Sequence, residues 1–165
     1  MWGGEKWPSN SKSLELLFQV FKVPFLGKFC KKRILVGLKI PLDTSIIKGF
    51  YCSAPNIEVG EHTGLGNSFI LAIGKVKIGR NTSLSYNNVI LTSTHNFKDF
   101  SEVIAKPVTI GNNVWITSNC ILLPGVTIGD NTVIGAGSVV THDIPSGVFA
   151  AGNPCKVIKK INFNK

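Results

Sequence analysis

The sequence has few charged residues and no long apolar run, and both absences restrict the class of protein. Charged residues make up 16% of the 165 residues and hydrophobic residues 44%, a balance that excludes an intrinsically disordered chain. No apolar run reaches the roughly 18 residues that a transmembrane helix needs. The first residues also lack the basic-then-apolar order of a signal peptide. We therefore expect one globular domain located in the cytoplasm.

The four cysteines indicate neither a disulfide framework nor a zinc site. Cys30, Cys52, Cys120 and Cys155 are widely spaced, and no C-x-x-C pair occurs. We expect them to be small buried side chains, and we expect no metal.

Positive charge is confined to the two ends of the chain. Of the formal net charge of +9, residues 1–50 contribute +6 and residues 156–165 contribute +4, while residues 51–155 carry −1. No recognition helix, zinc finger or interleaving of aromatic and basic residues accompanies this charge, so we do not expect a nucleic-acid binder. Anionic small molecules or a membrane surface fit the charge better.

A six-residue repeat predicts the fold. From residue 110 onward every sixth residue is aliphatic, and the residue four positions later is small or β-branched. The first set is Ile110, Ile116, Leu122, Ile128, Ile134 and Val140, and the second is Val114, Cys120, Val126, Thr132 and Ser138. The frame recurs upstream from Ile78, Leu84 and Ile90, and from Val59, Leu65 and Leu71, which leaves a seven-residue step from Leu71 to Ile78.

Each hexad can supply one short strand and one turn, so three hexads form a triangular coil. Coils stack at the strand spacing of about 4.8 Å, with the aliphatic residues inside and Gly or Asn at the corners. The pattern predicts an all-β protein, a parallel β-helix over residues 41–165. The frame stops after His95 and resumes near Val108, so residues 96–107 should protrude as a loop, where functional groups tend to lie.

Residues 1–40 are expected to form a helical cap. The apolar residues at helical spacing are Leu14, Leu17, Phe18, Phe21 and Phe25, and Pro24 should kink or end the helix. A solenoid end exposes unpaired strand edges and core, so a cap is needed there. The charge of this segment also suits a peripheral membrane contact through the Phe18, Phe21 and Phe25 face, and this alternative stays open.

About half of the chain resembles a known family. The segments TSTHNF, KPVTIGNNVWI, PGVTIGDNTVIGAGSVVTHDIP and AAGNPCKVIKKI, between residues 76 and 161, are together similar to the maltose, galactoside and nodulation-type acetyltransferases. The resemblance implies a left-handed β-helix; the handedness does not follow from the repeat. It also implies a homotrimer that moves acetyl from acetyl-CoA to a hydroxyl group, often on a sugar, at sites between subunits.

His95 is the expected general base. Acetyl transfer from a thioester to an alcohol requires removal of the alcohol proton, and imidazole, with an ordinary pKa of about 6.5, suits that step near neutral pH. His95 ends a hexad, opens the expected loop and matches the catalytic histidine of the family. No aspartate is placed for a His–Asp dyad, so a backbone carbonyl or Asp99 should orient the ring.

The resemblance assigns roles to seven further residues. Asn67 would position the acceptor or the tetrahedral intermediate, Trp115 would line the wall near the CoA arm, and the backbone N–H of Ser118 would bind the thioester oxygen. Ala136 and Thr141 would contact the pantetheine arm, and Lys156 and Lys159 the CoA phosphates. The chain departs from the family at Thr117, where glycine is usual.

Three other functions remain as alternatives. A γ-type carbonic anhydrase shares the fold but needs three zinc histidines, which the spacing of His62 and His95 does not provide. A catalytically silent scaffold would not need His95, Trp115 and the basic tail. An N-acetyltransferase of an amino-sugar nucleotide would use the same chemistry with an amine. The acceptor, a free saccharide or a surface-polysaccharide precursor, stays open.

Overall fold

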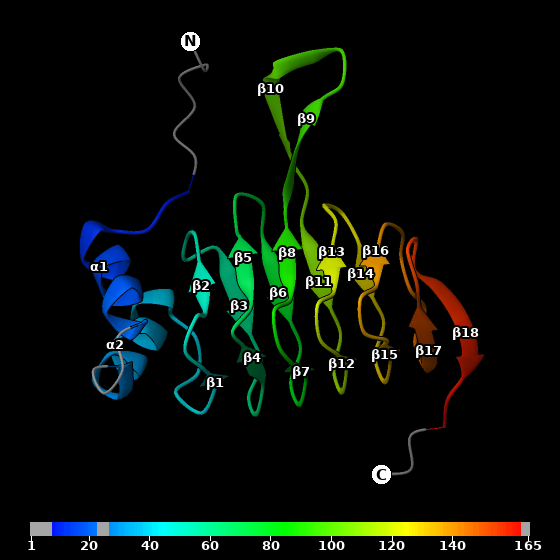
Figure 1. Cartoon of the computed structure of the whole chain (residues 1–165), viewed down its shortest axis with the longest axis horizontal. Coiled ribbons are helices and arrows are strands. Elements are labelled where there is room, and N and C mark those ends of the chain that lie inside the picture. The colour runs from blue at the N-terminus through cyan, green and yellow to red at the C-terminus, as the bar shows by residue number, and fades with distance from the viewer. Residues whose placement is uncertain (1–7, 23–26, 163–165) are drawn as a thin grey trace.

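The computed structural model describes residues 8–22 and 27–162. Two helices, α1 (Lys12–Phe21) and α2 (Gly27–Leu38), stand at one end, and short strands stack as parallel coils along the long axis (Figure 1). This architecture confirms the predicted β-helix with an N-terminal helical cap. Pro24 and Phe25, which we expected in the first helix, lie outside the described residues.

Within the described residues the coils form three faces. Face A contains β1 (Ser45–Ile46), β4 (Gly64–Gly66), β7 (Ser83–Leu84), β12 (Trp115–Ile116), β15 (Val133–Ile134), β17 (Val148–Ala151) and β18 (Lys156–Lys160). Face B contains β2 (Tyr51–Cys52), β5 (Phe69–Leu71), β8 (Val89–Leu91), β13 (Ile121–Leu122) and β16 (Val139–Val140). Face C contains β3 (Ile57–Val59), β6 (Val76–Ile78), β11 (Val108–Ile110) and β14 (Thr127–Ile128).

The turns between the faces form three edges of the solenoid. The A–B edge contains the turns from face A to face B, such as residues 117–120. The B–C edge contains turns such as residues 141–143, and the C–A edge contains turns such as residues 129–132.

The strand register follows the six-residue repeat. Ile116 pairs with Leu84 and Ile134, and Ile110 pairs with Ile78 and Ile128 in the same way. From residue 78 onward the aliphatic set is at most 4% exposed and the small set at most 3%. The two sets therefore make up the core of the solenoid, as the repeat predicts.

The predicted frame is wrong between residues 65 and 78. Ile70, not Leu71, is the inward residue: Ile70 is fully buried and pairs with Ile90, whereas Leu71 is half-buried. The steps are therefore five residues from Leu65 to Ile70 and eight from Ile70 to Ile78, in place of the expected six and seven. The turn is short because the left-handed residue, Gly66 with φ +56°, directly follows Leu65.

Close approach of neighbouring coils explains why glycine so often follows the aliphatic residue. A Cβ atom on Gly79 would lie 2.6 Å from the carbonyl carbon of Gly111, and one on Gly129 would lie 2.5 Å from the backbone nitrogen of Ser146. These glycines stand on the C–A edge, where each coil contacts the backbone of the next. A side chain there would force the coils apart.

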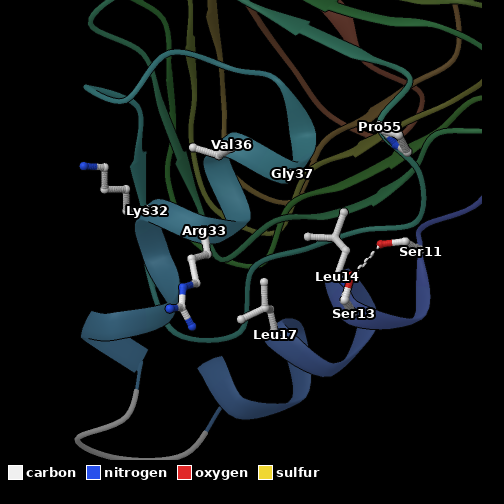
Figure 2. Close-up of a pocket in the computed structure, with 9 residues that line it drawn as sticks. All are labelled: Ser11, Ser13, Leu14, Leu17, Lys32, Arg33, Val36, Gly37 and Pro55. Atoms are coloured by element: carbon white, nitrogen blue, oxygen red, sulfur yellow. Dashed lines mark hydrogen bonds between the residues drawn. The ribbon is translucent and has the colours of Figure 1, made fainter.

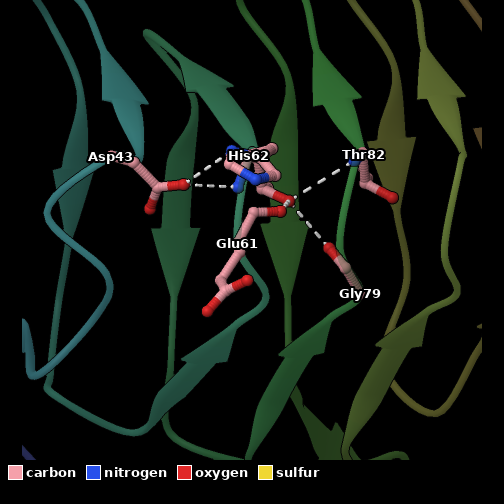
Figure 3. A network of polar contacts seen from close by, with 6 residues as sticks. Asp43, Glu61, His62, Gly79 and Thr82 are labelled. Carbon is pink, nitrogen blue, oxygen red and sulfur yellow. Dashed lines mark hydrogen bonds and ion pairs between the residues drawn. The ribbon is translucent and has the colours of Figure 1, made fainter.

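Polar side chains on the same edge link one coil to the next (Figure 3). The Thr63 hydroxyl donates to the carbonyl oxygen of Gly79 at 2.8 Å and accepts from the backbone N–H of Thr82 at 3.3 Å. His62 lies at the surface, with its Nδ1 atom 3.0 Å from the Asp43 carboxylate. Its backbone N–H donates to the same oxygen at 2.7 Å.

The cap buries the apolar face of α1. Phe18 is fully buried and packs against Phe50 and Tyr51, with ring centroids 6.1 and 5.0 Å apart, and Phe21 is 6% exposed. The capping role is therefore confirmed. The hypothesis that Phe18 and Phe21 lie on lipid is wrong, because both are covered by protein. In the described part of the chain, no helix is long and apolar enough to cross a membrane.

The protruding segment is an antiparallel hairpin of β9 (Ser93–Asn96) and β10 (Asp99–Ala105), which projects from the coils (Figure 1). It was expected as a loop over 96–107. Its base is closed by the Lys106 backbone N–H, which donates to the Thr92 carbonyl at 2.8 Å. The hairpin gives a fixed position to the side chains that it carries.

All four cysteines are buried and none forms a disulfide, as the spacing predicts. Burial raises the pKa of the Cys52 thiol to about 12. That thiol therefore stays protonated and acts as a small apolar side chain.

Candidate active site

His95 lies on β9, and a backbone carbonyl sets the orientation of its ring. The Nδ1 atom is 2.7 Å from the carbonyl oxygen of Phe100, on the opposite strand of the hairpin. Because a carbonyl oxygen only accepts, Nδ1 carries the proton in the neutral ring. The lone pair is then on Nε2, the protonation state that a general base requires.

The Asp99 carboxylate is hydrogen-bonded to a residue of its own strand, Ser101. This carboxylate accepts hydrogen bonds from the hydroxyl and the backbone N–H of Ser101, at 2.6 and 2.9 Å. These bonds lower the pKa of Asp99 from its ordinary value. Of the two expected partners of His95, the structure shows a backbone carbonyl, that of Phe100.

Three of the expected residues line up along the A–B edge. Asn67 donates from Nδ2 to the Asn87 side chain at 2.7 Å and accepts from the Asn87 backbone N–H at 2.7 Å. Further along the same edge, the Ser118 carbonyl accepts from the Gly137 N–H at 3.0 Å, next to Ala136. This edge therefore brings Asn67, Ser118 and Ala136 into one row.

Two backbone donors on this row are available for a ligand. Within the described part of the chain, the backbone N–H groups of Ser118 and Ala136 donate no hydrogen bond. Thr117, where the resemblance leads us to expect glycine, donates from its hydroxyl to the Ile134 carbonyl at 2.7 Å. An N–H group held in this way by a rigid turn suits the stabilisation of an oxyanion.

Trp115 stands on face A directly before this edge. Its side chain is 50% exposed, and its indole N–H donates to the Ser85 hydroxyl at 3.0 Å. A shallow groove of about 300 Å³ lies on the same face, lined by Gly64, Ser83, Ser85 and other residues. Sequence reasoning missed this groove; its only signal was the small residues at outward positions of face A.

The B–C edge holds the other group of expected residues. The hairpin with His95 leaves the solenoid at this edge, directly after Thr92. Thr141 lies on the same edge, nearer the C-terminal end, with its hydroxyl 2.7 Å from Nδ1 of His142. His95 and Thr141 are therefore on a different edge from Ser118 and Ala136.

Lys156 and Lys159 are exposed on β18, the last strand of face A. β12, which carries Trp115, is separated from β18 by β15 and β17. Three strand spacings amount to about 14 Å. An elongated ligand on this face would have Trp115 at one end and the two ammonium groups at the other.

Face B separates the two groups of site residues, and its outward side chains are apolar. They are Tyr51, Phe69, Val89, Ile121 and Val139, which follow one another in strand pairing. One chain by itself leaves His95 and Ser118 on opposite sides of this face. A second copy that covers face B would bring its own edge to the first.

Among the described residues, no three His, Cys, Asp or Glu side chains form a cluster that could hold a metal ion. His62 lies on the C–A edge, whereas His95 is on the hairpin at the B–C edge. The imidazole and the backbone donors are thus the groups with acid–base and electrostatic chemistry at the candidate site.

Comparisons with known proteins show the family and the fold of the chain. A family model described as bacterial transferase hexapeptide (six repeats) matches residues 107–142. The chain is 45% identical over 119 residues to the galactoside O-acetyltransferase of Escherichia coli (strain K12). That match covers 68% of this chain and 58% of the relative, so the chain spans less than two thirds of that protein's length.

Two solved structures are similar over most of the chain. The crystal structure of a maltose O-acetyltransferase from Clostridium difficile 630 has a TM-score of 0.80 and 34% identity, with 92% of this chain and 86% of that chain covered. A galactoside acetyltransferase in complex with coenzyme A has a TM-score of 0.71 and 34% identity, with 91% of this chain and 80% of that chain covered.

Proposed function

Because this chain belongs to the hexapeptide-repeat acetyltransferase family, we propose that it moves an acetyl group from acetyl-CoA to a hydroxyl group of a sugar. The relatives that support this substrate class are named as galactoside and maltose O-acetyltransferases. A solved relative with coenzyme A bound supports the acyl donor. The acceptor is a saccharide or a precursor of a surface polysaccharide, and the reaction takes place in the cytoplasm.

The observation that carries the mechanism is the hydrogen bond from Nδ1 of His95 to the Phe100 carbonyl. Nε2 of His95 takes the proton of the acceptor hydroxyl as the oxygen attacks the thioester carbonyl. The N–H of Ser118 donates to the oxyanion that forms. When the C–S bond breaks, the imidazolium of His95 returns the proton to the thiolate of CoA, and the acetyl ester is left on the acceptor.

We place the site between two copies of a homotrimer. His95 comes from the B–C edge of one copy, and Trp115, Ser118 and Ala136 come from the A–B edge of its neighbour. The apolar outward row of face B supports this assembly, because three copies around an axis would cover it. Asn67 lies on the same edge as Ser118 and would position the acceptor.

The remaining assigned residues would hold the CoA moiety. Trp115 and Ala136 would contact the pantetheine arm from one copy and Thr141 from the other. Lys156 and Lys159 would bind the phosphates, since two cationic residues on a strand about 14 Å from the strand of Trp115 suit an extended anionic ligand. The groove of about 300 Å³ beside Trp115 is the place where the sugar would enter.

A kinetic comparison of His95→Ala with the unchanged protein tests this function. Purified protein is incubated with labelled acetyl-CoA and a panel of saccharides, and acetyl ester formation is measured. The unchanged protein should acetylate at least one saccharide, and His95→Ala should lower kcat by roughly 10²–10⁴-fold. Full activity of the variant would refute the general-base role. Transfer only to an amino group would assign the chain to N-acetylation.

A further inference from the structure

One face of the helical cap combines apolar and cationic side chains. Four residues of α2 follow one another at spacings of three, one and three positions, and therefore share one side of the helix. They are Phe29, Lys32, Arg33 and Val36, and this set is called the cap face below. The residues that α2 buries, among them Ile34 and Leu38, lie on the opposite side.

The apolar members of the cap face are strongly exposed. Phe29 is 79% exposed and Val36 is 59% exposed, and Leu16 of the neighbouring α1 is 63% exposed. The end cap of a solenoid normally presents a polar outer surface, because it has no further coil to cover it. Large apolar side chains gathered at such an end indicate a surface that meets a partner.

A groove of about 550 Å³ runs between α1 and α2 beside this face. Leu14, Leu17 and Val36 give it an apolar lining, and Lys32 and Arg33 also line it. Figure 2 shows the Arg33 side chain extending toward the gap between the two helices, near Leu17, while Lys32 points outward. The groove therefore offers an apolar space with cations beside it.

The charge of the cap specifies the partner. Within the described residues, neither Lys32 nor Arg33 forms an ion pair. Residues 1–50 carry nine basic and three acidic residues, so the partner should be anionic. A partner that is both anionic and able to accept phenylalanine and valine side chains has the chemistry of a phospholipid surface.

We propose that the cap face docks on an anionic phospholipid membrane, with lipid phosphates at Lys32 and Arg33 and with Phe29 and Val36 at the headgroup–acyl boundary. This face is opposite to the buried face of the cap, so docking leaves the packing of the cap intact. In a trimer of parallel solenoids, three cap faces would lie at the same end and would bind together. Docking would bring the candidate active site close to a lipid-linked acceptor.

Vesicle flotation of the full chain tests the proposal. Vesicles of phosphatidylcholine with phosphatidylglycerol should retain the unchanged protein at low salt and release it as salt rises, and vesicles of phosphatidylcholine alone should not retain it. Lys32→Glu with Arg33→Glu should lower the bound fraction at least about tenfold. Phe29→Ser with Val36→Ser should lower it at least about fivefold. All four side chains are on the protein surface, and circular dichroism checks that the variants fold.

A matched control separates docking from net charge. Lys77→Glu with Arg80→Glu makes the same charge change on exposed residues of the solenoid, and it should leave flotation within about twofold of the unchanged protein. The proposal would be overturned if the control variant lost as much vesicle binding as the Lys32 and Arg33 variant. It would also be overturned if the unchanged protein did not float at low salt, or if the Phe29 and Val36 changes had no effect on the bound fraction. If the cap-face variants changed the oligomer mass and the unchanged protein bound no vesicles, the proposal would also be overturned, because the cap face would then be a contact between copies.

Flotation needs no catalysis, so failure here is distinguishable from failure of the proposed function. The cap face lies outside the candidate active site, and its variants should acetylate a water-soluble acceptor as fast as the unchanged protein does. Loss of that activity together with flotation would indicate that the cap had unfolded, a result that circular dichroism identifies independently.

Discussion

Gly66 offers a direct measurement of how tightly two coils pack at the A–B edge. Its φ is +56°, and a Cβ atom there would overlap the carbonyl oxygen of Ser85 and lie 2.7 Å from that of Leu84. Gly137 stands three turns further along the same edge with φ +71°, and a Cβ atom there would meet nothing within 4 Å. The two glycines share a left-handed backbone, but only at Gly66 would an added Cβ atom collide with the neighbouring coil.

This difference gives the expected stabilities of two alanine variants. A left-handed backbone costs a non-glycine residue about 1–2 kcal/mol, which both variants lose. Overlap with the next coil costs Gly66→Ala a further 1–3 kcal/mol or so. The free energy of unfolding should therefore fall by about 2–5 kcal/mol in Gly66→Ala and by about 1–2 kcal/mol in Gly137→Ala.

Thermal unfolding at one protein concentration compares the two. For a domain of this size, about 1 kcal/mol shifts Tm by roughly 2–4 °C, so Gly66→Ala should melt about 2–12 °C below Gly137→Ala. Equal melting temperatures would show that the coils are free to separate at this edge. The packing derived from the strand register would then be wrong at the turn between Leu65 and Ile70.

Three other changes test separate parts of the structure. Lys156→Ala with Lys159→Ala should raise the KM for acetyl-CoA about tenfold or more and leave the acceptor KM nearly unchanged; equal effects on both would show that the lysines do not recognise the phosphates. Ile121→Glu on face B should reduce the mass in light scattering from three times 17.8 kDa to that of one chain, whereas Thr109→Glu on face C should not. A monomeric unchanged protein with full activity would refute the trimer. Burial and the hydrogen bond to Glu15 raise the pKa of Tyr51 from 10.0 to about 12, so this group stabilises the fold below pH 10 and loses that contribution as pH rises toward 12. Denaturant titrations of Tyr51→Phe should show about 1 kcal/mol less stability at neutral pH and a smaller decline between pH 10 and 12; an unchanged decline would exclude Tyr51 as its cause.

The part of the fold with an unbroken repeat was predictable from the sequence. From Ile110 to Val140 the inward residue recurs at every sixth position. An unbroken repeat of this kind is compatible with only one strand register. The prediction failed at Leu71, because the short turn at Gly66 depends on where the left-handed residue lies within the turn. Extending the six-residue repeat along the sequence does not predict where the left-handed residue lies within each turn.

The candidate site was predictable in its residues but not in its geometry. The role of His95 followed from its residue type and from the family resemblance, whereas the partner of its Nδ1 is a main-chain atom, which every residue possesses. The distance between His95 and Ser118 around the solenoid follows from which edge each turn occupies. Both residues lie where the six-residue frame holds, but the repeat of one chain does not say which edge of a second copy would meet them.

The sequence also could not decide whether protein or lipid covers the apolar face of α1. Phe18 and Phe21 have the spacing of an amphipathic helix, which suits a protein core and a lipid surface equally well. Only the contacts of Phe18 with Phe50 and Tyr51 decide between the two. The exposed residues of α2 gave no comparable signal, because α2 has apolar and charged residues mixed around its surface.

Mixed trimers of two inactive variants test most directly whether each active site is shared between two copies. His95→Ala removes the base, and Ser118→Pro removes a backbone N–H that donates no hydrogen bond within the described residues. Each variant alone should be nearly inactive. If His95 of one copy works with Ser118 of the next, every mixed trimer contains one intact site, and random equal mixing should restore about a quarter of the activity of the unchanged protein. No recovery on co-assembly, with mixed trimers confirmed by mass, would place both groups in a single chain and contradict the shared site.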